Sequence, residues 1–176
     1  MSTAKAKPIK IYLISRISSD AHKWNEKVCK NLVNENIDVF IPHLHNEWNI
    51  AHEKISYAIV RTDVDQMKNA HFGLLLVPYG RDCAWEAGWF SHSNKILISF
   101  VHKNVSWLRD WMLKGGLDYI ITDSKKTYRI LQQDPVLNIR SIILLKSINN
   151  LHEVIEKIYT DEYVKKRRKK PLMSKG

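Results

Sequence analysis

A single glutamate stands in an aromatic and apolar segment of the chain, where a solvated carboxylate is unusual. The segment runs from Tyr79 to Phe90, reads YGRDCAWEAGWF, and has Glu86 near its centre. Glutamate is seldom buried without a partner, so its presence here indicates chemistry. Such a carboxylate can stabilise a developing positive charge or attack an electrophilic carbon. We therefore take Glu86 as a candidate catalytic residue; the alternative is a first-turn glutamate that favours the helix dipole.

The elements around this segment follow an alternating pattern of strands and helices. Apolar runs predict strands at 9–15, 37–41, 72–77 and 95–101, with further candidates at 117–121 and 140–145. Helical spacing predicts helices at 21–36, 55–69, 82–93, 107–113 and from 150 onward, with Asp82 as an N-cap. This alternation is typical of a parallel sheet covered on both faces. We predict an α/β fold, a flavodoxin- or Rossmann-like three-layer sandwich with a mainly parallel sheet of about five strands.

In such a fold the ligand site lies beyond the carboxyl ends of the strands, which here are followed by the loops 15–20, 42–54 and 78–82. The first loop carries Arg16 with the hydroxyls of Ser15, Ser18 and Ser19 at the start of a predicted helix. Guanidinium and hydroxyl donors at a helix N-terminus can hold a phosphate. The alternative is an exposed arginine beside ordinary capping serines. Neither GxGxxG nor GxxxxGK[ST] occurs in the chain.

The charge of the chain is concentrated at one end. The net charge is +10, and the stretch 161–176 holds seven Lys and Arg residues against two acids, so half of the excess lies there. A mildly basic body argues against nucleic-acid binding by the fold itself. We predict a flexible N-terminus (1–8), a single α/β domain (9–160) and a basic, disordered C-terminal tail (161–176). A nuclear address or nucleic-acid contact through the tail is the alternative that we do not favour.

Cysteine, histidine and hydropathy patterns indicate a cytoplasmic protein without a metal. Cys29 and Cys83 are the only cysteines, and no apolar run approaches the ~20 residues of a membrane span. The polar, lysine-rich N-terminus does not resemble a secretory signal. His43, His45 and His52 match no standard zinc spacing. We therefore expect no metal, no cofactor and no membrane contact, and a cytoplasmic location, or a nuclear one if the tail is an address.

Three stretches of the chain resemble the nucleoside 2-deoxyribosyltransferase family, which includes nucleotide N-hydrolases. Residues 10–15 (KIYLIS) are similar to the opening strand of the family, and residues 63–77 to its aspartate-bearing helix and next strand. Residues 83–90 (CAWEAGWF) resemble its A-W-E-x-G-aromatic signature. The likeness spans roughly residues 9–101. The chain departs from the pattern at Gly80, where the family carries an aspartate, and at Cys83, where threonine is common.

The resemblance implies cleavage or transfer of the N-glycosidic bond of a nucleoside or its 5′-monophosphate, and an oligomeric protein. Glu86 then acts as the nucleophile and Tyr12 orients it, while Asp63 and Asp82 are the candidate acids for the leaving base. The first loop, with Ser15, Arg16, Ser18 and Ser19, is then expected to bind the phosphate of the substrate. Gly80 and Arg81 complete the predicted binding residues.

Two other functions remain open from the sequence. The helix of a TIR-like NAD hydrolase carries its glutamate in a Cys-x-x-Glu motif, which residues 83–86 also match. A non-catalytic nucleotide-sensing module would use the same cleft without releasing a base. Base preference, ribose against deoxyribose, and hydrolysis against transfer are not decided by these patterns.

Overall fold

Six short apolar runs form one parallel sheet in the order β2-β1-β3-β4-β5-β6. The computed structural model describes residues 7–45, 52–103 and 105–165. The α/β prediction is confirmed, with six strands where about five were expected. Their bounds are β1 Ile9–Ile14, β2 Ile37–Phe40, β3 Phe72–Leu76, β4 Ile96–Phe100, β5 Tyr119–Thr122 and β6 Ser141–Leu144.

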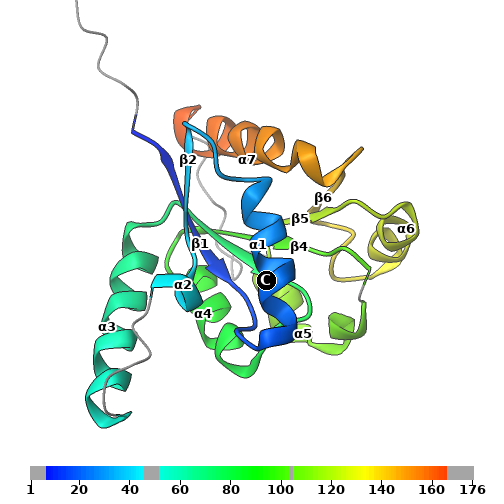
Figure 1. Cartoon of the computed structure of the whole chain (residues 1–176). Helices are drawn as coiled ribbons and strands as arrows, with labels where there is room; N and C mark the ends of the chain where they lie inside the picture. The colour runs from blue at the N-terminus through cyan, green and yellow to red at the C-terminus, as the bar shows by residue number, and fades with distance from the viewer. Residues whose placement is uncertain (1–6, 46–51, 104, 166–176) are drawn as a thin grey trace, which may run out of the picture.

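Helices cover both faces of this sheet and make it the middle of three layers (Figure 1). One face packs against α1 and α7, the other against α3, α4 and α6. The helices are α1 Ser19–Lys30, α2 Pro42–His45, α3 His52–Asn69, α4 Arg81–His92, α5 Trp111–Gly116, α6 Lys125–Gln133 and α7 Leu151–Tyr159. Shorter turns are η1 Ser106–Arg109, η2 Ile148–Asn150 and η3 Thr160–Val164. None of the described helices is both long and apolar enough to cross a membrane.

The alternation of side chains along β1 decides which residues reach α4. Ile11 and Leu13 belong to the core beneath α1, whereas Tyr12 belongs to the core beneath α4. Gly73 lies beside Tyr12 in the sheet, and a Cβ on Gly73 would come within 2.7 Å of the Phe90 ring. The missing side chain lets Phe90, and with it α4, lie directly on the sheet.

Several predicted boundaries were wrong for local reasons. Helix α1 ends at Lys30 and not at Asn36, because Asn31 is its C-cap and the Asn34 side chain accepts a bond from the Asn36 N–H at 2.8 Å. Asp82 is not the N-cap of α4; Gly80 takes that place and Asp82 lies in the first turn. Helix α6 was missed, although Ser124 caps it and Thr127 and Leu131 are buried on one side; the segment 125–133 is short and mostly polar.

The end of the last helix is tied to the amino-terminal edge of the sheet. The Tyr119 hydroxyl donates to the Glu162 carboxylate, and the Tyr163 hydroxyl donates to the His71 carbonyl at 2.5 Å. Tyr163 also stacks on Tyr159, with ring centroids 5.3 Å apart. These contacts extend the folded body past residue 160. Residues 166–176, which hold most of the predicted tail, lie outside the described residues.

Two truncations test how far the body extends. Removal of residues 166–176 keeps the Glu162 and Tyr163 bonds, so we expect the melting temperature to stay within about 1 °C of that of the full chain. Removal of 161–176 deletes both bonds and the aromatic stack. Because each bond stabilises by about 1 kcal/mol, we expect a fall of at least ~3 °C. Thermal unfolding followed by circular dichroism gives both values, and equal melting temperatures for the two truncations would contradict this account.

Candidate functional site

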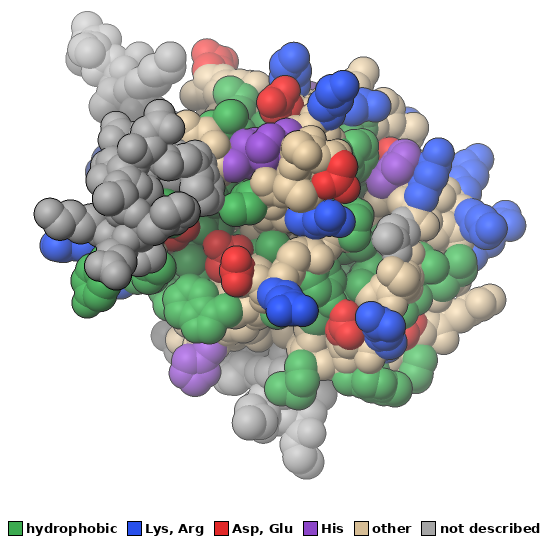
Figure 2. Space-filling view, turned by 60° about the horizontal axis from the view of Figure 1, so that its bottom comes forward, with side chains coloured by type: hydrophobic (Ala, Val, Ile, Leu, Met, Phe, Trp, Pro, Cys, Tyr) green, Lys and Arg blue, Asp and Glu red, His purple; other side chains and the backbone are tan. Residues whose placement is uncertain are grey.

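A cavity of about 680 Å³ opens at the carboxyl ends of β1 and β3. From β1 the chain first adds β2 on one side and then crosses to add β3 on the other, so the strand order reverses between β1 and β3. Ligands of such sheets bind at this point of reversal. Figure 2 shows this face, with acidic and hydrophobic side chains side by side at a hollow. The lining residues are Ser15, Arg16, Ile17, Ser18, Pro42, Ile59, Val60, Asp63, Val64, Gly80, Asp82, Cys83, Trp85 and Glu86.

Seven of the ten predicted site residues line this cavity together: Ser15, Arg16, Ser18, Asp63, Gly80, Asp82 and Glu86. Ser19 and Arg81 are exposed and lie outside the lining. Tyr12 is also outside it, fully buried, and reaches the site through its bond to Glu86. Two loops and two helices that are distant in the sequence thus converge on one space.

The Tyr12 hydroxyl donates a hydrogen bond to Oε1 of Glu86 at 2.6 Å. Burial and the neighbouring Glu86 charge raise the pKa of Tyr12, so its hydroxyl keeps the proton that it donates. Burial raises the pKa of Glu86 to about 7, with further increases from the charges of Asp63 and Asp82, whereas the Tyr12 bond lowers it. At neutral pH the carboxyl group is therefore poised between its charged and neutral forms, as acid–base and nucleophilic chemistry require.

The two aspartates reach the cavity from different helices. Asp63 extends from α3, which lies over the sheet on the same face as α4. Asp82 lies in the first turn of α4, four residues before Glu86 and so on the same side of the helix. Both negative charges act on Glu86 strongly enough to raise its pKa. The site therefore holds three carboxyl groups around one space.

The β1–α1 loop presents hydrogen-bond donors to the cavity. Ser15 follows β1 and is 5% exposed, and its hydroxyl has no hydrogen-bond partner among the described residues. Ser18 is the N-cap of α1 and makes no capping bond with its side chain. The Arg16 guanidinium lies 3.4 Å from Asp20 in the same turn. This loop can hold an anion, provided that the anion displaces Asp20 from Arg16.

An apolar wall completes the cavity, and sequence reasoning did not assign it to the site. Its side chains are Ile17, Pro42, Ile59, Val60, Val64, Cys83 and Trp85. The signal was available on α3, where the spacing 59, 60, 63 and 64 places one aspartate in an apolar stripe. Trp85 is 59% exposed, so it is not a core residue. Burial raises the pKa of the Cys83 thiol to about 12, so Cys83 contributes surface and not a thiolate.

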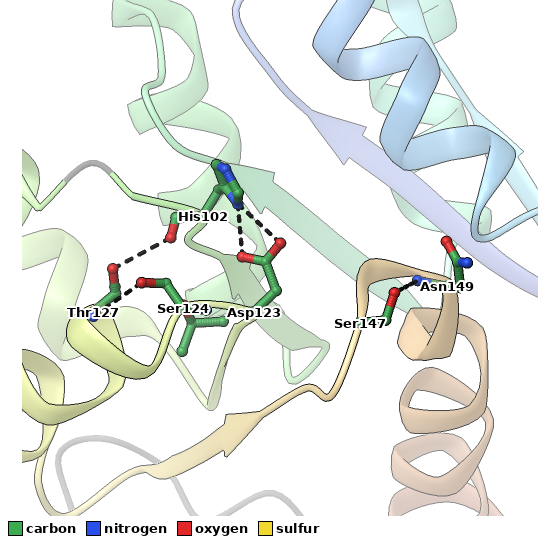
Figure 3. Close-up of polar contacts among 7 residues, drawn as sticks. His102, Asp123, Ser124, Thr127, Ser147 and Asn149 are labelled. Carbon is green, nitrogen blue, oxygen red and sulfur yellow. Dashed lines mark hydrogen bonds and ion pairs between the residues drawn. The ribbon is translucent and has the colours of Figure 1, made fainter.

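A second polar cluster lies on the same edge of the sheet, after β4 and β5 (Figure 3). Nδ1 of His102 is 2.7 Å and 2.9 Å from the two carboxylate oxygens of Asp123. The Ser124 hydroxyl caps α6 by accepting from the Thr127 N–H, and the Thr127 hydroxyl donates to the His102 carbonyl at 3.3 Å. None of these residues lines the cavity. Their bonds join the two loops to the start of α6.

The predicted histidine-rich loop is only partly described. His43 stacks on His22 with ring centroids 4.3 Å apart, and the His45 ring bonds the Ile41 carbonyl at 2.8 Å. The side chain of His52 lies outside the described part of the structure. Among the described residues, no group of three or more His, Cys, Asp or Glu side chains is arranged to hold a metal ion.

Comparison with known proteins identifies a shared fold. No protein-family model matches the chain, and no curated protein sequence matches it. A solved structure of a 2-deoxyribosyltransferase from the psychrotolerant bacterium Bacillus psychrosaccharolyticus is similar, with a TM-score of 0.50 and 20% sequence identity. The similarity covers 63% of this chain and 84% of that chain. The two proteins share a fold. At this identity, fold is what the likeness shows.

Direct titration of Glu86 tests the electrostatics of the site. Carbon-13 NMR of labelled glutamate should give a pKa near 7 for Glu86 in the unaltered chain. The value should rise in Tyr12→Phe, which removes a bond to the charged form, and fall in Asp82→Asn, which removes a repelling charge. Because the folded pKa exceeds the ordinary 4.5, the stability contributed by this group falls as pH rises from 4.5 to 7. A titration near 4.5 in all three proteins would contradict the assignment.

Proposed function

We propose that this protein cleaves or transfers the N-glycosidic bond of a nucleoside 5′-monophosphate or nucleoside, with Glu86 as the nucleophile. The observation that carries the proposal is the partly buried Glu86 carboxyl, held by the Tyr12 hydroxyl at 2.6 Å and facing a cavity with two further carboxylates. The shared fold with a 2-deoxyribosyltransferase and the likeness of residues 83–90 to the family signature support it.

The proposed reaction proceeds in two steps. An Oε atom of Glu86 bonds to the anomeric carbon while the C–N bond breaks and its electron pair goes to the base. A neutral base leaves more readily when an acid protonates it, and Asp63 and Asp82 line the cavity as candidates. Water, or the nitrogen of a second base, then attacks the anomeric carbon and releases Glu86. The first outcome is hydrolysis and the second is transfer.

Tyr12 has a positioning role in this mechanism. Its ring is fixed between Phe40 and Phe90, with centroid distances of 5.6 Å and 6.0 Å. The hydroxyl therefore holds one oxygen of Glu86 and leaves the other to face the substrate. The same bond favours the ionised carboxylate, which is the form that attacks.

The remaining parts of the cavity match the other parts of a nucleotide. Its volume of about 680 Å³ lies within the usual range of small-molecule sites, roughly 300–1,000 Å³. The donors of Ser15, Arg16 and Ser18 suit a 5′-phosphate at the N-terminus of α1, with Ser19 at the first helical position. The apolar wall of α3 together with Trp85 suits the planar base.

The first test is base release from a panel of nucleosides and their 5′-monophosphates, analysed by chromatography. Glu86→Gln keeps the shape of the side chain but removes the nucleophile, so we expect a loss of at least about 10³-fold in kcat. Glu153→Gln, an exposed position on α7 away from the cavity, serves as the matched control and should keep full activity. Activity of folded Glu86→Gln near that of the unaltered chain would exclude Glu86 as the nucleophile.

The second test concerns the phosphate. Loss of the guanidinium in Arg16→Ala should lower kcat/KM for the monophosphate by roughly ten- to a hundredfold, because charge-assisted bonds to phosphate are worth about 1.5–3 kcal/mol. Activity on the free nucleoside should be low and nearly unchanged. Arg109→Ala removes an exposed arginine outside the cavity and is the control. Equal activity on both substrates, unaffected by Arg16→Ala, would show that the first loop does not bind phosphate.

A further inference from the structure

The cavity is lined by groups of both charges. Arg16 is the only Lys or Arg side chain among the described residues that line it, and it lies on the β1–α1 loop. Asp63, Asp82 and Glu86 border the cavity from α3 and α4. On the face shown in Figure 2, most Lys and Arg side chains gather away from the hollow. A ligand whose negative group binds Arg16 therefore shares the cavity with three carboxyl groups.

Trp85 adds an aromatic surface beside Asp82. Trp85 and Glu86 lie three and four residues after Asp82, so each is a neighbour of Asp82 on the surface of α4. All three line the cavity, and the Trp85 indole is 59% exposed. Tryptophan has the most favourable ring face for a cation, particularly a flat cation that can stack on it. A carboxylate and an exposed indole on one helix side form a site for a flat, positively charged ring.

We propose that the preferred substrate carries a cationic aromatic base, such as an N-alkylated purine or a pyridinium ring, joined to a sugar 5′-phosphate. The inference rests on the proposed function and specifies its substrate class. The phosphate contacts Arg16 and Ser15, and the cationic ring stacks on Trp85 beside Asp82. Each charged part of the substrate thus meets protein groups of opposite charge, which favours one orientation of binding.

The reaction of such a base differs from that of a neutral one in its proton requirement. When the C–N bond breaks, its electron pair goes to the ring nitrogen and cancels the positive charge of the ring. The base leaves neutral, so no proton has to be delivered. Glu86 takes the sugar as an ester, and water or an acceptor then releases it. With such a base, Asp82 is needed for binding and not as the acid that protonates the leaving group.

Binding of the isolated ring tests the charge preference without any turnover. 1-Methylnicotinamide is a cation, and nicotinamide is its neutral counterpart with the same ring. By calorimetry on the full chain at low salt, we expect the cation to bind about tenfold more tightly. Asp82→Asn and Trp85→Leu should each remove most of this difference, and added salt should reduce it. Asp65→Asn removes an exposed carboxylate that pairs with Lys68 outside the cavity, and should leave it unchanged.

Turnover of a matched substrate pair completes the test. Nicotinamide mononucleotide has a cationic base, whereas the ring carboxylate of nicotinic acid mononucleotide cancels that charge. Faster base release from nicotinamide mononucleotide than from nicotinic acid mononucleotide supports the inference, provided that the ratio of the two rates falls in Asp82→Asn. Equal binding of the two rings together with release from neutral-base monophosphates overturns the inference and leaves the proposed function standing. Absence of release from both cationic and neutral substrates overturns both.

Discussion

The site depends on one hydrogen bond between residues 74 positions apart, from the Tyr12 hydroxyl to Glu86. Tyr12 is held between two phenylalanine rings in the core, so the bond fixes the carboxylate relative to the sheet and not only to its own helix. Gly73 makes this geometry possible, because Phe90 occupies the space that a side chain would need. Burial and nearby aspartates make the charged carboxylate costly, and the Tyr12 bond partly offsets that cost. A weakly stabilised carboxylate is more reactive than a well-paired one.

The groups proposed to hold the phosphate and those proposed to hold the base differ in how they are prepared for a ligand. Arg16 already has an acidic neighbour in Asp20, so part of the energy of phosphate binding would be used to separate that pair. Asp20 is exposed and can turn to solvent. On α4, Asp82 and the exposed Trp85 indole both line the cavity before any ligand arrives. Under the proposed function, a bound nucleotide would contact a rearranged loop and a preformed helix surface.

The sequence was most informative where one local rule decides the outcome. Uninterrupted apolar runs identified the inner strands, and the aromatic setting of Glu86 identified a site residue that lines the cavity. Predictions failed where several rules compete. Asp82 is a good N-cap by type, yet Gly80, two residues earlier, is the N-cap of α4 and Asp82 lies in its first turn. The apolar wall was missed because Ile59, Val60 and Val64 have the spacing of ordinary core residues, and only the assembled fold leaves that stripe facing a cavity.

The position of β1 inside the sheet has a consequence for synthesis on the ribosome. Its partners are β2, which follows within 30 residues, and β3, in which Gly73 lies beside Tyr12. A nascent chain that ends before Phe72 therefore carries a largely apolar strand with one open edge, and such edges pair readily with other chains. The later strands β4, β5 and β6 each add to the strand just made. The open apolar edge thus passes from β1 to β3, then to β4 and β5, and the chain stays open to misassembly until β6 is added.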